Sequence, residues 1–412
     1  MLKISLFLIF WSFVALNVNS VRVCNSFISY FNVLGCDCYN NIDDTLNVTE
    51  ILRRWKFTAE EHRITTPDGY TILLSRAYTS LTRNSQPVVL GHGMFSNSMS
   101  FVYNGNNSLA YNLGLLGYDV WLVNFRGTRY SRGHRNLTTS DPKYWDFSFH
   151  QLGTLDLGAA LTYITRITTK KSVYIGYSTG TTVSYVYAST RPVDAGTTLK
   201  GIISLAPIGY IDGGLPFQKY FDPVISFIKR IIYRLLRGEV LKRNLILNQG
   251  MKTMAFTPIT MFVAQAILGV FGGFDFSQMD PLTYPVFLTN VFDSAGVNLL
   301  EHADQLRKTG NFQWYDYGNE GNLARYGSPT PPPYRLNLIP VPVTMYVGRN
   351  DRVALEKPAQ KTYTEIANRF RNGFNMMNNT RWNHFDFITS KNLKTELYKA
   401  LVETVRSMFL LK

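Results

Sequence analysis

One short motif constrains the fold of this chain more than any other feature, the sequence Gly-Tyr-Ser-Thr-Gly at residues 176–180. An apolar, β-rich run at 173–175 comes directly before it, and a helix-compatible stretch at 181–189 follows it. A serine in a G-x-S-x-G turn between a buried strand and a helix is typical of a nucleophile elbow, where the glycines permit a strained backbone. We therefore predict that Ser178 is a nucleophile, with a glycine-rich surface turn as the alternative interpretation.

Short apolar runs elsewhere alternate with helix-compatible segments. The runs lie at 71–74, 87–90, 118–123, 202–205 and 341–347. This alternation predicts an α/β fold with a mostly parallel sheet and helices on both faces.

A serine hydroxyl needs a base, and the base needs a carboxylate that orients it. In the order typical of α/β-hydrolases, both follow the serine. Of the six histidines only His302 and His384 do so, and His384 lies near the C-terminus, where the last loop of the sheet is expected. We predict His384 as the base and Asp351, directly after the run at 341–347, as the acid. A plain turn residue is the alternative for Asp351.

An oxyanion hole needs backbone N–H donors near the nucleophile. One donor is expected from Thr179, the residue after the serine, and the other from Met94, which follows an early strand. His92 in the same loop is interpreted as a structural histidine.

The first twenty residues are typical of a secretory signal peptide. Lys3 precedes an apolar run at 4–16, and we place the cleavage site after Ser20. A membrane anchor is the weaker alternative because the run is shorter than the roughly 18 to 20 residues that a span needs. Four N-glycosylation sequons agree with a secreted or lysosomal glycoprotein, and they begin at Asn47, Asn106, Asn136 and Asn378.

Three cysteines lie near the predicted mature N-terminus. A bridge from Cys24 to either Cys36 or Cys38 is expected, which leaves one thiol unassigned. No second ligand pair accompanies Cys36 and Cys38, so we predict no zinc site, and we expect no metal or cofactor. The net charge of +14 is scattered along the chain, which disfavours nucleic acid as a partner.

The segment 208–335 interrupts the alternation of strands and helices. It contains a candidate basic amphipathic helix at 225–237 and an uncharged run at 253–274. The run is long enough to span a membrane, but its proline and glycines favour a mainly helical, apolar cap over a lipid site. The predicted domains are a signal peptide (1–20), a hydrolase core in two parts (21–207 and 336–412) and an inserted cap (208–335).

Together these features resemble the acid lipase family, which includes the gastric and lysosomal acid lipases. The motifs that carry the resemblance lie at 47–51, 66–70, 90–94, 117–122, 124–127, 145–149, 176–180, 350–351 and 384–388. The resemblance implies an α/β-hydrolase fold with a large inserted cap, and a triad of Ser178, Asp351 and His384. It implies Met94 and Thr179 as oxyanion donors.

The chain departs from the family pattern in two places. Tyr177 stands where the family usually has a histidine, and we expect its side chain to point away from the reaction with altered packing. Family members often have a cysteine pair in the cap, which this chain lacks.

We predict a secreted or lysosomal serine lipase that acts on neutral lipid, either triacylglycerol or sterol ester, through an acyl-enzyme. Its expected partner is a lipid–water interface, which it contacts peripherally without a transmembrane span. One alternative is a non-catalytic lipid carrier on a hydrolase fold, against which a complete triad argues. The other is a carboxylesterase for soluble short-chain esters, which has little need for so apolar a cap.

Overall fold

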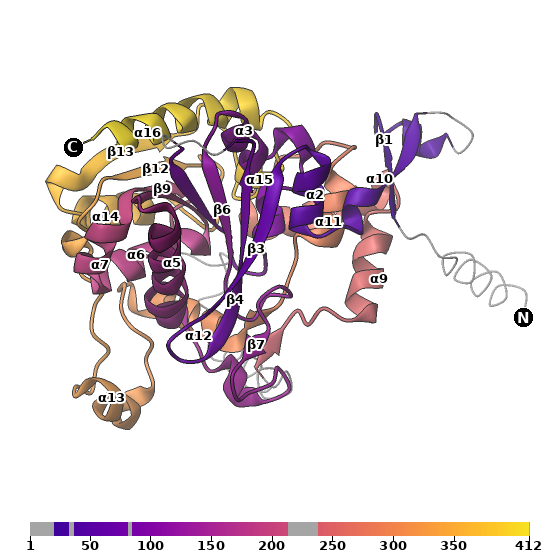
Figure 1. Cartoon of the computed structure of the whole chain (residues 1–412). Helices are drawn as coiled ribbons and strands as arrows, with labels where there is room; N and C mark the ends of the chain where they lie inside the picture. The colour runs from indigo at the N-terminus through magenta and orange to yellow at the C-terminus, as the bar shows by residue number, and fades with distance from the viewer. Residues whose placement is uncertain (1–19, 33–36, 81–84, 213–237, 412) are drawn as a thin grey trace, which may run out of the picture.

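The structure of the protein is a computed structural model that describes residues 20–32, 37–80, 85–212 and 238–411 (Figure 1). All but the last residue of the predicted signal peptide lies outside the described residues, as does the whole of the candidate basic helix at 225–237.

In the part of the chain that the structure describes, nine strands form one central sheet. The strand order from edge to edge is β13-β12-β9-β8-β5-β6-β4-β3, and β7 pairs with β4. Neighbours from β13 to β6 are parallel, whereas β4 pairs antiparallel with β6, β3 and β7. The bounds are Thr58–Thr65 (β3), Tyr70–Tyr78 (β4), Pro87–Gly91 (β5), Asp119–Asn124 (β6), Gly133–His134 (β7), Ser172–Tyr177 (β8), Leu199–Leu205 (β9), Val343–Val347 (β12) and Arg371–Met376 (β13).

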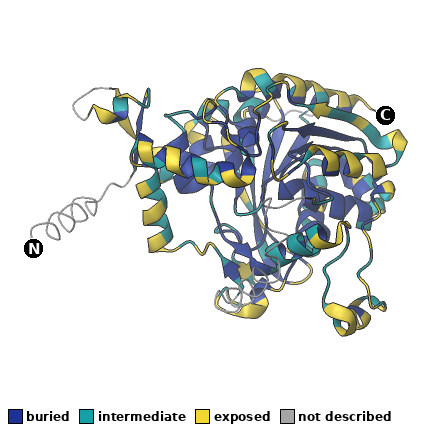
Figure 2. Ribbon diagram, turned by 180° about the vertical axis from the view of Figure 1, so that it is seen from behind, coloured by how far each residue is buried: buried dark blue, intermediate teal, exposed yellow. Residues whose placement is uncertain are grey.

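The two faces of the sheet carry separate hydrophobic cores, because successive side chains of a strand point to opposite faces. In β5, Val88 and Leu90 pack into a core that includes side chains of α3 and α16, whereas Val89 packs into the core of α5 and α6. Strands β5, β6 and β8 are buried at every position, which is typical of parallel strands covered on both faces (Figure 2). The predicted mostly parallel sheet with helices on both faces is therefore confirmed.

The helices of this core lie between the strands in sequence, except that α2 precedes β3 and that α15 and α16 follow the last strand. Their bounds are Val48–Arg54 (α2), Leu109–Leu115 (α3), Phe149–Gln151 (α4), Gly158–Thr168 (α5), Thr179–Thr190 (α6), Pro192–Thr198 (α7), Glu356–Glu365 (α14), Asp386–Thr389 (α15) and Lys399–Leu410 (α16).

Between β9 and β12 the described chain is mainly helical. Its elements are Glu239–Val240 (β10), Leu245–Met254 (α9), Pro258–Gly272 (α10), Tyr284–Asn290 (α11), Ala295–Gly296 (β11), Val297–Thr309 (α12) and Gly318–Tyr326 (α13). They fall inside the predicted cap, and the exact domain bounds stay a prediction.

A small hairpin precedes the core, made of β1 (Val21–Cys24) and β2 (Cys38–Asn41). A disulfide joins Cys24 to Cys38, so of the two partners left open for Cys24 the structure has Cys38. The hairpin lies beside α10 in Figure 1, and the rings of Phe27 and Phe262 contact each other with centroids 5.1 Å apart.

Candidate active site

Ser178 occupies a sharp turn between β8 and α6. Its φ of 53° and ψ of −122° form a strained backbone conformation for a residue with a side chain. A Cβ atom on Gly176 would lie 2.7 Å from the backbone of Gly180, and one on Gly180 would lie 2.2 Å from the carbonyl oxygen of Gly91. Both glycines are therefore required for the close approach of the helix to the strands, and the predicted strand–turn–helix context is confirmed.

The fold brings the three predicted triad side chains together. The Nε2 atom of His384 lies 2.8 Å from Oγ of Ser178, and its Nδ1 atom lies 2.9 Å from Oδ2 of Asp351. The other carboxylate oxygen of Asp351 accepts hydrogen bonds from the backbone N–H groups of Val353 (2.8 Å) and Ala354 (2.7 Å). This pair of bonds fixes the carboxylate so that Oδ2 faces the imidazole. All three side chains are buried, with Ser178 7% exposed.

The loop that carries His384 is attached to the end of α10. The backbone N–H of His384 donates to the carbonyl oxygen of Gly272 at 2.9 Å. A Cβ atom on Gly272 would lie 2.5 Å from the ring of Phe385, so only glycine fits there without a shift. The position of the imidazole thus depends on the C-terminal end of α10, a contact that no local sequence signal indicates.

Tyr177 does not point away from the site, and this expectation was wrong. Its ring packs on the imidazole of His384 with centroids 5.4 Å apart, and its hydroxyl donates to the carbonyl oxygen of His384 at 3.1 Å. A tyrosine is long enough to pass beneath the nucleophile and reach the loop of the histidine. The expected change in packing is therefore present, but it supports the imidazole directly.

The loop after β5 lies against the nucleophile. A Cβ atom on Gly93 would lie 3.1 Å from Cβ of Ser178, which places the next residue, Met94, beside the serine. In the described part of the chain, no turn or loop hydrogen bond engages the backbone N–H of Met94 or of Thr179. Both N–H groups are thus free to donate to a negatively charged oxygen near Oγ of Ser178.

His92 in the same loop fits the predicted structural role. Its Nε2 accepts from the backbone N–H of Phe125 at 3.2 Å, and its Nδ1 donates to the carbonyl oxygen of Gly93 at 2.8 Å. Burial lowers the pKa of His92 to about 4, so the ring stays neutral and holds the loop in place.

Asp386, two residues after His384, forms its hydrogen bonds with other groups than the imidazole of His384. Its carboxylate accepts from the backbone N–H of Asn383 at 2.8 Å, and desolvation by burial raises its pKa well above the usual range. Among the described residues, no cluster of three or more His, Cys, Asp or Glu side chains is arranged to hold a metal ion.

The chain is similar in sequence to lipases and to other α/β-hydrolases. A family described as a partial alpha/beta-hydrolase lipase region matches residues 48–105, and the alpha/beta hydrolase fold family matches residues 86–222. Lipase 1 of Drosophila melanogaster is 29% identical over 88% of this chain and 80% of its own length. The gastric triacylglycerol lipase of Rattus norvegicus is 27% identical over 88% of this chain and 92% of its own.

A solved structure shares the fold. A soluble variant of the monoglyceride lipase from Saccharomyces cerevisiae superposes with a TM-score of 0.50 and 14% identity, over 85% of this chain and 95% of that one. The chain has the α/β-hydrolase fold, and its sequence is similar to those of gastric triacylglycerol lipases. It is a carboxylic ester hydrolase, as the sequence predicts.

This α/β-hydrolase exposes apolar side chains along the whole of α10. The exposed side chains recur every three or four residues along the helix, and they are Ile259, Phe262, Val263, Ile267, Val270 and Phe271. We call this set the apolar face of α10. Within the described residues no single helix is long and apolar enough to cross a membrane, although α9 and α10 together meet such criteria despite a bend of 110°.

The predicted glycosylation sites differ in accessibility. Asn106, Asn136 and Asn378 are exposed. Asn47 is half-buried and caps α2, where its side-chain oxygen accepts from the backbone N–H of Glu50 at 2.9 Å. Their modification stays a prediction.

Proposed function

We propose that this protein is a secreted or lysosomal serine lipase that hydrolyses ester bonds of neutral lipids, triacylglycerol or sterol ester. The observation that carries the proposal is the continuous hydrogen-bonded chain from Ser178 through His384 to Asp351. Such a chain supplies a nucleophile, a base and an orienting carboxylate, which is what acyl transfer to serine requires.

In the first half of the reaction, Ser178 attacks the ester carbonyl carbon while Nε2 of His384 takes the hydroxyl proton. The carbonyl oxygen becomes an oxyanion, which the N–H groups of Met94 and Thr179 stabilise together with the N-terminus of α6. Asp351 stabilises the imidazolium that forms. His384 then gives its proton to the leaving alcohol, and the acyl group remains on Ser178.

In the second half, a water molecule takes the place of the alcohol. His384 removes a proton from the water, which attacks the acyl-enzyme and passes through a second oxyanion. Return of the proton to Ser178 releases the fatty acid. The ester and the water are the only reactants, and the protons move between them and Ser178 through His384.

The apolar face of α10 supports a lipid substrate. Contiguous exposed apolar surface is rare on monomeric proteins and marks sites of contact with a partner or a lipid. Phe256, Phe274 and Phe276 extend this surface beyond both ends of the helix, with exposed fractions of 60%, 38% and 39%. A peripheral contact with a lipid–water interface explains why these side chains face outward.

The proposed compartment is supported by the Cys24–Cys38 disulfide, because such bonds persist in oxidising environments. Exposed sequons at Asn106, Asn136 and Asn378 are consistent with it.

Of the alternatives, a non-catalytic carrier has no need for the assembled triad. A short-chain carboxylesterase does have the triad, and the exposed face of α10 is the observation that favours a lipase over it.

A serine-directed phosphonate tests the chemistry. The wild-type protein should be labelled on Ser178 and should hydrolyse emulsified triacylglycerol or sterol ester, whereas Ser178→Ala should do neither and remain folded. Ser189→Ala is the matched control. Ser189 is a buried serine on α6, the helix that begins directly after Ser178, and its hydroxyl donates to the carbonyl oxygen of Val186. Labelling that persists in Ser178→Ala would place the nucleophile elsewhere. Hydrolysis of dissolved short-chain esters without hydrolysis of emulsions would support the carboxylesterase instead.

A further inference from the structure

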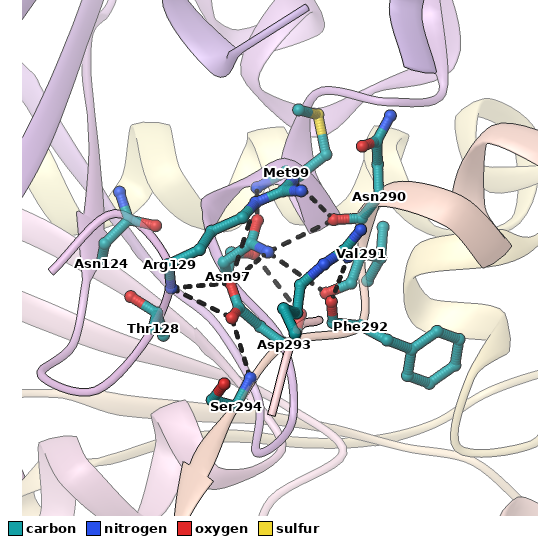
Figure 3. Close-up of polar contacts among 12 residues, drawn as sticks. Asn97, Met99, Asn124, Thr128, Arg129, Asn290, Val291, Phe292, Asp293 and Ser294 are labelled. Carbon is teal, nitrogen blue, oxygen red and sulfur yellow. Dashed lines mark hydrogen bonds and ion pairs between the residues drawn. The ribbon is translucent and has the colours of Figure 1, made fainter. Parts of the chain in front are cut away.

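A buried carboxylate from the helical segment between β9 and β12 reaches the loop that holds Met94. Asp293 lies between α11 and β11, and its side chain has no exposed surface. Figure 3 shows it in contact with two core segments, one around Asn97 and one around Arg129. These segments lie 196 and 164 residues away in the sequence.

The contacts of Asp293 are numerous and short. Its carboxylate accepts from Nδ2 of Asn97 at 2.9 Å, and from the backbone N–H of Arg129 at 3.0 and 3.1 Å. It also accepts from the backbone N–H of Ser294 at 2.8 Å. A buried carboxylate is costly unless donors surround it, and here three N–H groups do so. The site is therefore built around a carboxylate rather than around an amide or an apolar group.

The backbone of Asp293 acts on the same loop. Its N–H donates to the carbonyl oxygen of Phe95 at 2.9 Å. Phe95 has a φ of 56°, in the left-handed region that a residue with a large side chain rarely adopts without support. Phe95 directly follows Met94, so the bond to Asp293 holds the strained residue next to the oxyanion donor.

Asn97 closes the other end of this loop. Its Oδ1 accepts from the backbone N–H of Met99 at 2.8 Å, which leaves its Nδ2 to point at Asp293 and at the carbonyl oxygens of Asn290 and Val291. Residues 93–97, which we call the oxyanion loop, are thus held at Phe95 and at Asn97 by a single residue.

The segment around Asp293 is itself anchored. The Arg129 side chain donates to the carbonyl oxygen of Asn290 at 2.8 Å, and Arg243 donates to the carbonyl oxygens of Phe292 (2.7 Å) and Thr289 (2.8 Å). Two arginines therefore fix the backbone that presents Asp293, so the carboxylate has little freedom to follow a shift of the oxyanion loop.

We propose that Asp293 is a positioning residue for the oxyanion hole, which sets the direction of the Met94 N–H by holding Phe95 and Asn97. This rests on the proposed function, in which Met94 donates to the oxyanion. The predicted cap then has a role besides covering the site, because one of its residues, Asp293, orients the oxyanion loop on the side away from the substrate.

Exchanging the two polar side chains tests this role. Asp293→Asn turns an amide toward the amide of Asn97, and Asn97→Asp turns a carboxylate toward the carboxylate of Asp293. The double exchange, Asn97→Asp with Asp293→Asn, restores one carboxylate facing one amide. The active sites of each variant are titrated with the serine-directed phosphonate, and kcat and KM are then measured on a dissolved short-chain ester. Inhibition by a trifluoromethyl ketone, whose adduct with Ser178 carries an oxyanion, is measured in parallel.

We expect Asp293→Asn to lower kcat per titrated site by about 10- to 100-fold, below the 10²- to 10³-fold loss that removal of an oxyanion donor causes. KM should change little, and the ketone should bind more weakly by a similar factor, because the defect concerns the oxyanion. The double exchange should recover part of the kcat that Asp293→Asn loses, since contacting residues couple. It should not recover all of it, because a carboxylate at position 97 also faces the carbonyl oxygens of Asn290 and Val291.

Asp119→Asn is the matched control. Asp119 is 2% exposed and accepts two hydrogen bonds from Arg76 at 2.9 Å. It pairs with Pro87 at the start of β5, whereas the oxyanion loop follows the other end of that strand. This variant should lose thermal stability but keep wild-type kcat per titrated site.

A wild-type kcat per titrated site in Asp293→Asn, with only a lower melting temperature, would reduce Asp293 to a structural role and overturn the proposal. If Asp293→Asn does not fold, Asn97→Ala removes one contact and keeps the other donors, and it should still lower kcat severalfold; an unchanged kcat there also overturns the proposal. Failure of the proposed function looks different, because the wild-type protein itself would then not be labelled by the phosphonate.

Discussion

Strand β5 and helix α10 are both apolar almost throughout, yet the fold puts their side chains in opposite environments. Every residue of β5 is buried between helices on two sides. Helix α10 also buries one face, which includes Met261, Ala264 and Gln265. Its other face is equally apolar and stays exposed, with Ile259 64% and Ile267 53% exposed. Burial in the core explains the composition of β5. The outer face of α10, by contrast, stays largely exposed in the described protein, although the ring of Phe262 contacts Phe27.

The difference in burial between β5 and α10 corresponds to two different roles. In our proposal the sheet positions the reacting groups, because β8 ends directly before Ser178 and β12 ends four residues before Asp351. Helix α10 positions the molecule on its substrate. The two regions touch where the N–H of His384 donates to the carbonyl oxygen of Gly272, at the end of α10. Substitutions on each side should therefore affect different measurements.

The largest effect is expected in the core. Asp351→Asn should lower kcat by about 10⁴-fold, because an amide favours the wrong tautomer of the imidazole of His384. The loss should be the same on emulsified and on dissolved esters, and binding to lipid vesicles should be unchanged. Near-normal rates would transfer the role of the acid to another carboxylate, with Asp386 the closest in sequence to His384.

Some features of the site could be predicted from the sequence and others could not. The elbow of Ser178 was predictable because strand, turn and helix are contiguous, and the order of Asp351 and His384 follows from the common topology of such sheets. The orientation of Tyr177 was predicted wrongly, since the length of a tyrosine side chain and the position of the loop it reaches are not local properties.

Contacts between distant segments were not predictable at all. The bond from Asn97 to Asp293 joins residues 196 apart, and an isolated aspartate in a helical segment carries no pattern that identifies its partner. The exposure of one face of α10 could not be predicted from the sequence for a different reason. When both faces of a helix are apolar, periodicity cannot tell which one the protein covers.

A second, smaller effect is expected on the pH dependence of stability. It concerns His302, a residue of the predicted cap that is buried as deeply as the residues of β5. His302 on α12 has no exposed surface; its Nε2 donates to the carbonyl oxygen of Gln313 at 2.9 Å, and its ring stacks on Phe149. Burial lowers the pKa of His302 to about 4, with a further decrease from nearby His150. The unfolded chain binds this proton near pH 6.5 and the folded chain does not. The stability contributed by neutral His302 is therefore complete above pH 6.5 and is lost as the pH falls toward 4.

His302→Gln keeps a donor for Gln313 but does not titrate. Between pH 7 and pH 4, its free energy of unfolding should fall by about 3 kcal/mol less than that of the wild-type protein. Denaturant unfolding at a series of pH values measures this difference. Parallel stability curves for the two proteins would mean that His302 is not the buried neutral group described above.

The smallest effect in free energy, and the one that most directly tests the comparison, lies on the apolar face of α10. A half-exposed isoleucine that enters a lipid surface contributes on the order of 1 kcal/mol, and a carboxylate in its place opposes entry. Ile267→Asp should therefore weaken binding to neutral-lipid emulsions and lower activity on them by about 10-fold. Turnover of a dissolved short-chain ester should be much less affected, because the side chain points away from the protein.

Val193→Asp on α7 is the matched control, since Val193 is 79% exposed and belongs to the helices of the core. If both variants lose emulsion activity equally, the effect is one of charge alone and α10 has no special contact with lipid. If neither loses it, the outer face of α10 serves another partner, and the difference between the two regions has a cause other than the substrate.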